Sequence, residues 1–146
     1  MLYPARHALY SSDLFAQRCG LPMSPLDDMV AFHIIFGKTV PDISRHAIAN
    51  LGYAEGRFHH PAYAGDTLSA RSQVIGLREN SNGKSGIVMV RTTGLNQHDE
   101  IVLDYVRWVM VRKNDLDRAA PTPVMPQLAD NVAEHDLLLP EADFSD

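Results

Sequence analysis

One stretch of the sequence restricts the fold more than any other. Residues 29–36 read Met-Val-Ala-Phe-His-Ile-Ile-Phe, which is apolar at every position but one. A surface helix shows a polar face, and this stretch has none, so we expect a helix that the rest of the fold surrounds. Ser24 can cap its first turn, Pro25 suits the first helical position, and Pro41 ends it. The sequence therefore predicts a central apolar helix over residues 25–40; a buried strand is the other interpretation of so short a run.

The chain that follows has the pattern of β-strands. Branched and aromatic residues fill four segments, and turn-forming residues separate them. Short loops between successive strands predict an antiparallel meander. The last strand is apolar on both faces, so one face can cover the helix while the other meets solvent or a partner. A short helix over residues 13–19, stopped by Gly20, precedes the central helix. The predicted strands are residues 51–58, 67–79, 86–95 and 100–113.

The C-terminal part of the sequence has a different composition. It contains several prolines and many acidic residues and shows no periodic apolar pattern, as is typical of a tail or linker. We therefore expect one domain over residues 1–113 and an extended tail or linker over residues 114–146. One apolar helix wrapped by a curved antiparallel sheet is an α+β domain of the hot-dog type. A cystatin-like α+β roll has the same ingredients and is the alternative fold.

Charge and cysteine content exclude several classes of function. The formal net charge is −5, the opposite of what a duplex-binding domain usually carries, so we expect no nucleic acid partner. Cys19 is the only cysteine, which excludes disulfides and cysteine-based zinc sites; its helical, apolar surroundings predict a packing role. No stretch approaches the length of a membrane span or a signal peptide core, so the expected location is cytoplasmic.

Few residues are candidates for chemistry. The sequence has no phosphate-binding glycine loop and no nucleophile elbow. His59 and His60 are adjacent and would point to opposite sides of a strand, so we expect no metal site. His33 lies within the apolar run, where a core histidine bonded to backbone is the expected role. The weak candidates for contact with a substrate are Asp27, Asp28, His33 and Arg57.

The two acidic candidates have a structural explanation as well as a functional one. Asp27 and Asp28 lie where the positive end of the helix dipole favours anions, so capping accounts for both. The alternative is that this end of the helix approaches a substrate. Arg57 begins the string RFHHPAYAGDTL, residues 57–68, in which a hairpin with Asp66 bonded to its own turn is the structural interpretation.

The same string resembles the MaoC-like hot-dog proteins, which hydrate or dehydrate acyl-CoA thioesters. Four segments are closer still to one subgroup, the mesaconyl-CoA hydratases, also called β-methylmalyl-CoA dehydratases. The resemblance covers residues 2–139 and corresponds to the first of the two hot-dog halves of that subgroup, without its usual first strand. The segments are FHIIFGKTVPDIS (32–44), AIANLGYAEGRF (47–58), GDTLSARSQVIGLREN (65–80) and VLDYVRWVMVRK (102–113).

This resemblance implies a hydro-lyase acting on an acyl-CoA without a cofactor. The acid–base pair of the family belongs to a D-x-N-P-x-H-x-D-type motif before the central helix. On that motif this sequence has Ala5 in place of the aspartate and Tyr10 in place of the histidine. The resemblance therefore implies no catalytic residue in this chain, which would supply an acyl-CoA-binding wall. Nothing near Tyr10 in the sequence would tune its proton, and the N-terminus of the central helix could stabilise an enolate oxygen.

The missing pair has to come from elsewhere. We expect a second hot-dog unit, either another copy of this chain or a separate catalytic half. One alternative function is a non-catalytic hot-dog partner that binds acyl-CoA or has a structural role. The other is a thioesterase, which the fold also hosts and which would use Asp27 or Asp28 on the central helix.

Overall fold

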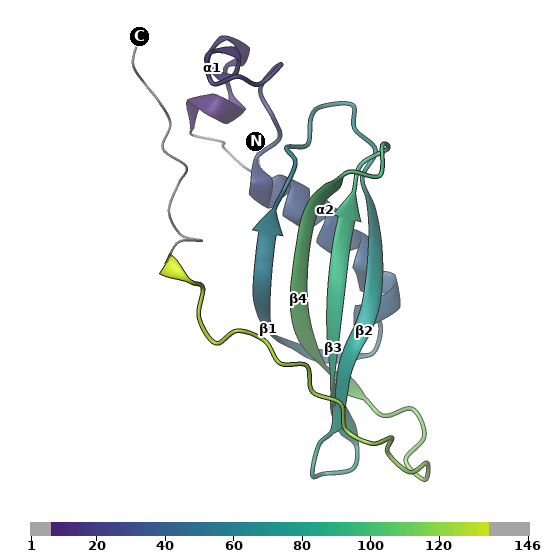
Figure 1. Ribbon diagram of the computed structural model, residues 1–146. Helices are drawn as coiled ribbons and strands as arrows, with labels where there is room; N and C mark the ends of the chain where they lie inside the picture. The colour runs from purple at the N-terminus through teal and green to yellow at the C-terminus, as the bar shows by residue number, and fades with distance from the viewer. Residues whose placement is uncertain (1–6, 135–146) are drawn as a thin grey trace.

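The computed structural model describes residues 7–134. Two short turns flank the helical part: a 3-10 turn, η1, over Ala8–Tyr10 and a π turn, η2, over Val40–Ser44. The four strands form one antiparallel sheet, and helix α2 lies against one of its faces (Figure 1). The helices and strands are α1 (Asp13–Arg18), α2 (Asp28–Thr39), β1 (Ala47–Phe58), β2 (Ser69–Glu79), β3 (Ser85–Leu95) and β4 (Ile101–Arg112).

Helix α1 forms where the sequence predicts it. The Ser12 hydroxyl accepts a hydrogen bond from the Phe15 N–H at 3.2 Å and caps the first turn. Gly20 has a φ of 84°, a conformation that glycine adopts without strain, and the helix stops before it. The expected packing role of Cys19 is wrong, because the thiol is exposed. Only Ala16 of this helix is buried, so the side that carries Cys19 meets solvent.

The central helix begins later than the sequence predicts. Its first residue is Asp28, not Pro25, and its N-cap is Asp27, not Ser24. The Asp27 carboxylate accepts the Met29 N–H at 2.9 Å, which satisfies one of the donors left free at a helix start.

Two contacts hold the preceding residues out of the helix. The backbone N–H and the hydroxyl of Ser24 both donate to Oδ1 of Asp13, at 2.9 and 2.6 Å. Leu26 donates its N–H to the carbonyl of Ala62 at 2.7 Å. These bonds tie residues 24 and 26 to other segments of the chain, and the extended segment continues to residue 27.

The order of strands differs from the predicted meander. Strands β2, β3 and β4 are joined by short loops and pair in sequence, but β1 pairs with β4, giving the order β1-β4-β3-β2. Both sides of β3 are occupied by its hairpin neighbours, and the connection 59–68 carries the chain across the end of the sheet. Strand β1 also starts at Ala47, four residues earlier than expected. The other three strands agree with the prediction to within two residues.

The core lies between α2 and the helix-facing side of β4. Ile35 is fully buried there, together with Leu103 and Tyr105 of β4. Gly94 of β3 permits the close approach, because a Cβ at that position would overlap Ile35, with two of the contacts at 2.8 and 2.9 Å. The glycine therefore sets how near the helix can lie to the sheet.

The expectation that the whole helix is surrounded is wrong for this chain. Four strands cover one side of α2, and the apolar side chains on the other side stay open to solvent. Met29 is 43% exposed and Ile34 is 39% exposed. The adjoining strand β1 lies at the edge of the sheet and exposes Ile48 (50%) and Leu51 (40%). An apolar helix face and an apolar edge strand are thus left without cover.

The tail follows the sheet. Beyond β4 it crosses the face opposite α2 (Figure 1). At Val124 it meets the edge of β2, where Val124 and Leu77 exchange backbone hydrogen bonds at 2.8 and 2.9 Å. A Cβ at Gly76 would lie 2.5 Å from Cδ of Pro126 and 2.8 Å from the carbonyl oxygen of Val124. The docked position of the tail therefore depends on a glycine at residue 76.

Candidate functional site

The first polar cluster lies at the start of α2. Turn η1 places the Tyr10 hydroxyl 3.3 Å from Oδ2 of Asp28, to which it donates a hydrogen bond. Burial raises the pKa of Asp28, the Tyr10 hydrogen bond lowers it, and the charge of Asp27 raises it again. The pKa of Tyr10 is also raised, first by burial and then by Asp28. The residue that stands at the histidine position therefore has a carboxylate partner that its neighbours in sequence do not reveal. Ala5, the other family position, lies outside the described residues.

The same end of the helix has few free donors for a substrate oxygen. Met29 gives its N–H to the Asp27 carboxylate, and Val30 and Ala31 give theirs to the Asp27 carbonyl at 2.8 and 3.1 Å. An arriving oxyanion would also meet the carboxylates of Asp27 and Asp28. The geometry thus gives little support to the expected oxyanion role of this helix end.

The other two candidates lie elsewhere. His33 is exposed on α2, and its ring centroid is 5.5 Å from that of Phe32 in an edge arrangement. The expectation of a core histidine is wrong, because only one side of the helix is covered. Arg57 is exposed on β1, opposite Asp104 of β4, on the sheet face away from α2. The structure brings Asp27 and Asp28 together and separates them from His33 and Arg57.

The most buried charge is one that the sequence reasoning missed. Arg107 is 0% exposed and projects from β4 toward α2. Its Nη2 donates to Oγ1 of Thr39 at 3.0 Å, and its guanidinium lies over the Phe36 ring, 4.7 Å from the centroid. Burial lowers the pKa of Arg107, although an arginine stays charged at neutral pH. Strand alternation could have found it, because position 107 shares the face of Leu103 and Tyr105.

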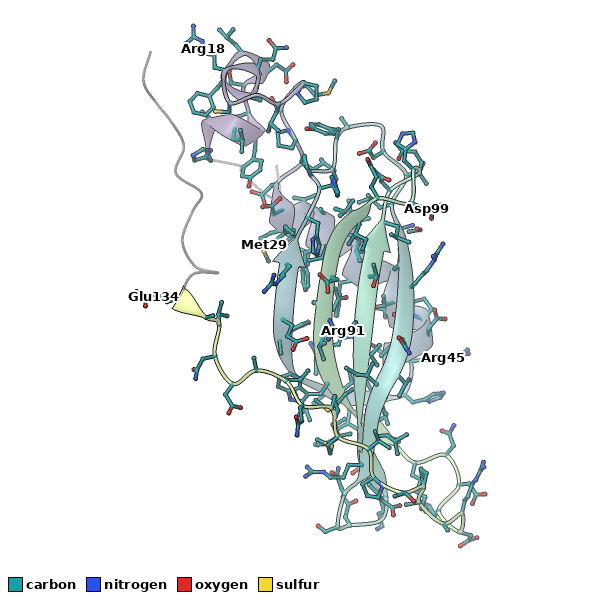
Figure 2. The ribbon with its side chains drawn as sticks, in the orientation of Figure 1. Arg18, Met29, Arg45, Arg91, Asp99 and Glu134 are labelled. Carbon is teal, nitrogen blue, oxygen red and sulfur yellow. The ribbon has the colours of Figure 1, made fainter. Side chains whose placement is uncertain are left out.

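A second group of charges lies on the sheet face opposite α2, where Figure 2 labels Arg91. Arg91 bonds Glu55 at 2.5 Å and Asp104 at 3.4 Å, and His59 contacts Asp104 at 2.5 Å. A groove of about 910 Å³ runs between these residues and the tail at 129–133. The pairs join β1, β3 and β4 across this face, which gives them a structural role.

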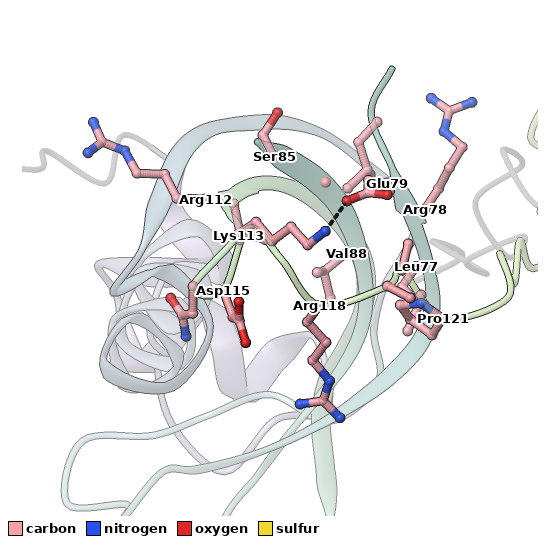
Figure 3. Close-up of a pocket in the computed structure, with 16 residues that line it drawn as sticks. Leu77, Arg78, Glu79, Ser85, Val88, Arg112, Lys113, Asp115, Arg118 and Pro121 are labelled. Atoms are coloured by element: carbon pink, nitrogen blue, oxygen red, sulfur yellow. Dashed lines mark hydrogen bonds and ion pairs between the residues drawn. The ribbon is translucent and has the colours of Figure 1, made fainter. Parts of the chain in front are cut away.

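A hollow with a mostly apolar wall lies at the far end of the sheet from Asp28. Its volume is about 570 Å³, and the start of the tail lines one side of it. Figure 3 shows the Lys113–Glu79 ion pair crossing it, with Nζ and Oε1 2.6 Å apart. Arg78 and Arg112 extend away from the hollow in this view, so the nearby cations do not converge on one point.

Metal binding and membrane insertion have no support in the described part of the chain. Within residues 7–134, no three histidine, cysteine or acidic side chains come together in a way that could hold a metal ion. No helix in the same part of the chain has both the length and the apolar character needed to cross a bilayer.

Comparison with known proteins identifies the fold. Residues 26–105, from the segment before α2 to the middle of β4, match the family model described as FAS1-like, dehydratase domain region. The chain belongs to this dehydratase family. The match covers more than half of the sequence and includes α2, β1, β2 and β3 in full.

Two proteins that are similar to this chain in sequence are much longer than it is. The chain is 66% identical over 140 residues to mesaconyl-CoA hydratase of Cereibacter sphaeroides. The aligned residues make up 96% of this chain and 41% of the relative. A crystal structure of a MaoC domain protein dehydratase from Chloroflexus aurantiacus is 58% identical, with a TM-score of 0.88 over 95% of this chain and 40% of the other. The chain therefore spans about two fifths of the length of the relatives that it matches.

A second solved structure confirms the architecture. A conserved protein of Mycobacterium tuberculosis with a double hot-dog fold is 27% identical, with a TM-score of 0.67 over 94% of this chain and 42% of that one. The predicted α+β hot-dog fold and the MaoC-like resemblance are confirmed, and the cystatin-like roll is set aside.

Proposed function

We propose that this chain forms the acyl-CoA-binding half of a MaoC-like hydro-lyase. Its substrate would be a short branched acyl-CoA such as mesaconyl-CoA, and the reaction would need no cofactor. The observation that carries this proposal is the 66% identity to mesaconyl-CoA hydratase over nearly the whole chain. Because the match spans only part of that relative, binding and chemistry are proposed to lie on different units.

The demands of the reaction support this division. Hydration of an unsaturated thioester needs a base that activates water, an acid that protonates the α-carbon, and donors for the enolate oxygen. Tyr10 stands where the family has its histidine, and its hydroxyl already donates a hydrogen bond to Asp28. The donors at the start of α2 are largely occupied. We therefore assign the acid, the base and the enolate donors to a second hot-dog unit.

The uncovered surface offers that unit a place. Strand β1 is an edge strand, so one side of its backbone is free to pair with another strand. Ile48, Leu51 and Tyr53 on β1 and Ile34 on α2 are each at least 39% exposed, a combination that favours an apolar partner surface. A hot-dog unit that extends the sheet beyond β1 would cover these side chains.

An assay of the chain with and without a partner tests the proposal. The partner would be the remaining half of the Cereibacter sphaeroides relative, expressed with this chain. We expect no hydration of mesaconyl-CoA by the chain alone and clear hydration by the pair. Tyr10→Phe in the pair should leave kcat within about twofold, since no proton transfer is assigned to Tyr10.

Each other result has a definite meaning. Robust hydration by the chain alone would show that it carries its own acid and base. Calorimetry that finds no binding of CoA thioesters, alone or in the pair, would leave a structural partner as the function. The thioesterase alternative has less support, because Asp27 caps the helix and Asp28 is bonded to Tyr10.

A further inference from the structure

The guanidinium of Arg107 has fewer partners than its burial requires. Nη2 is bonded to Thr39, but Nε and Nη1 have no hydrogen-bond partner among residues 7–134. The hydroxyl of Tyr105, two residues earlier on the same strand, is also buried and makes no hydrogen bond of standard geometry in that part of the chain, although the side chains of Thr92 and Thr39 lie close enough to lower its pKa. Buried donors without acceptors are rare in folded proteins, and a buried charge without a counter-charge is unfavourable.

Other cationic side chains of the chain have a carboxylate partner, which Arg107 lacks among the described residues. Arg91 contacts two carboxylates, and Lys113 contacts that of Glu79. For Arg107 the ionisable groups that act on its charge are the hydroxyls of Tyr105 and Tyr53. The most deeply buried cation of the described chain therefore stands without an anion, although the chain carries an excess of acidic residues.

The free donors share one side of the fold. Tyr105 and Arg107 are two residues apart on β4, so their side chains lie on the same face of the strand and project toward α2. Nη1 carries two N–H groups and Nε carries one, and these groups point in different directions in the plane of the guanidinium, so a carboxylate would be met through Nη1. The Tyr105 hydroxyl can supply a third donor. Tyr53 stands opposite Arg107 on β1 and is 46% exposed, so this ring separates the buried donors from solvent at the edge of the sheet.

We propose that Arg107 and Tyr105 form the receptor for one carboxylate group, the free carboxylate of the acyl moiety. This inference rests on the proposed function. A mesaconyl group is a short unsaturated chain with a methyl branch and a terminal carboxylate, and that carboxylate distinguishes it from ordinary branched acyl groups. The receptor determines specificity, since it recognises the end of the acyl group that does not react.

The receptor also gives the ligand a direction. Arg107 contacts Phe36 and Thr39, which lie about 12–16 Å along the helix axis from Asp28. With its carboxylate at Arg107, the acyl group would lie beside the second half of α2. The pantetheine arm would then extend toward the Tyr10–Asp28 end, where the sequence places the edge of the cleft.

A pair of matched thioesters tests the receptor. Tiglyl-CoA has a methyl group where mesaconyl-CoA has its terminal carboxylate. We expect the assembled pair of hot-dog units to bind mesaconyl-CoA about 10- to 100-fold more tightly than tiglyl-CoA, which is the range of charge-assisted hydrogen bonds. Arg107→Met should remove this preference and Tyr105→Phe should reduce it. Arg71→Met is the control, because Arg71 is exposed and pairs with the exposed Asp99.

Folding of the variants can be checked independently. Arg107→Met replaces an incompletely paired buried charge with an apolar chain, so we expect a Tm equal to or above that of the wild type. Arg107→Lys keeps the charge without the planar fork and should retain part of the preference. If Arg107→Met does not fold, the Arg107→Lys variant tests whether Arg107 determines the preference for mesaconyl-CoA.

The outcomes separate the inference from the function on which it rests. Equal binding of the two thioesters by the wild type, or an unchanged preference in Arg107→Met, would overturn the receptor and leave the proposed function intact. An unchanged preference together with weaker assembly of the two units would show that the carboxylate comes from the partner unit, which also overturns it. Absence of binding by both thioesters would refute the proposed function itself.

Discussion

Tyr10 donates its hydroxyl hydrogen to Oδ2 of Asp28, and the two residues are 18 positions apart in the sequence. This bond joins turn η1 to the first turn of α2. It also explains why the tyrosine at the family's histidine position need not be an acid in the reaction. Its proton is directed at a carboxylate of its own chain, and burial raises the pKa of both groups.

The Tyr10–Asp28 bond predicts a measurable titration. The pKa of Asp28 should lie above the ordinary value for aspartate, and Tyr10→Phe should raise it further, because the hydrogen bond that lowers it is lost. A raised pKa means that the stability from this group is present below the unfolded pKa and is lost as pH rises through the folded pKa. Carbon NMR of the carboxyl group measures this directly. Tyr63→Phe is the control and should leave Asp28 unchanged; a titration below the ordinary value would contradict the prediction.

Two glycines test how closely the helix and the sheet are packed. Gly37 lies inside α2 with nothing within 4 Å of a Cβ, so Gly37→Ala should stabilise the fold by about 0.5–1 kcal/mol. Gly94→Ala places a methyl group against the fully buried Ile35 and should destabilise it by about 1–3 kcal/mol. Urea unfolding of both variants gives the two free energies. Equal effects of the two substitutions would mean that α2 is not held against β3 at this distance.

The docked tail predicts a change in proteolysis. Gly76→Ala would drive a Cβ into Pro126 and the Val124 carbonyl, so the tail should leave the edge of β2. We expect faster cleavage within residues 114–134 in limited proteolysis, with the sheet fragment intact. Val124→Pro removes the N–H that Val124 gives to Leu77 and should act in the same direction. An unchanged cleavage rate in both variants would show that the bridge does not hold the tail.

Asp66 should stabilise the turn before β2 in a pH-dependent way. It accepts hydrogen bonds from the Tyr63 N–H and from Gln97, which lower its pKa. The stability from this group is therefore present above the unfolded pKa and is lost as pH falls through the folded pKa. Asp66→Asn should cost about 1 kcal/mol at neutral pH, after allowance for solvent exposure, and nothing at strongly acidic pH. Unfolding at several pH values measures the difference, and Asp28→Asn should show a pH dependence of opposite sign.

The sequence predicted the elements whose causes are local. Strands β2, β3 and β4 agree to within two residues, since alternation and turn residues mark both ends of each. The start of α2 depends instead on the Leu26–Ala62 bond, which joins segments that no local pattern connects. The position of β1 beside β4 has the same origin, because an edge strand can pair with either open edge of a meander.

The candidate site could be predicted only in part. Asp27 and Asp28 were found because capping signals are local, whereas the bond from Tyr10 crosses 18 residues. His33 was placed in the core because an apolar run does not show how much of a helix the sheet covers. Arg107 was passed over because its Thr39 partner is 68 residues away and a cation in a strand reads as a surface residue.

The pairing of β1 with β4 has a consequence for how the chain acquires its structure. Strand β1 is synthesised first and can pair only after β4, the last strand, has been synthesised, because Tyr53 lies opposite Arg107. The loop between β1 and β4 is long, and its closure costs entropy before the stabilising contacts between these strands can form. We therefore expect slow folding for a domain of this size. During that interval α2 and β1 show apolar surface to other chains, which favours aggregation or the help of a chaperone. A chain that stopped before β4 would leave β1 without a strand to pair with, and α2 would lose its contacts with Tyr105 and Arg107.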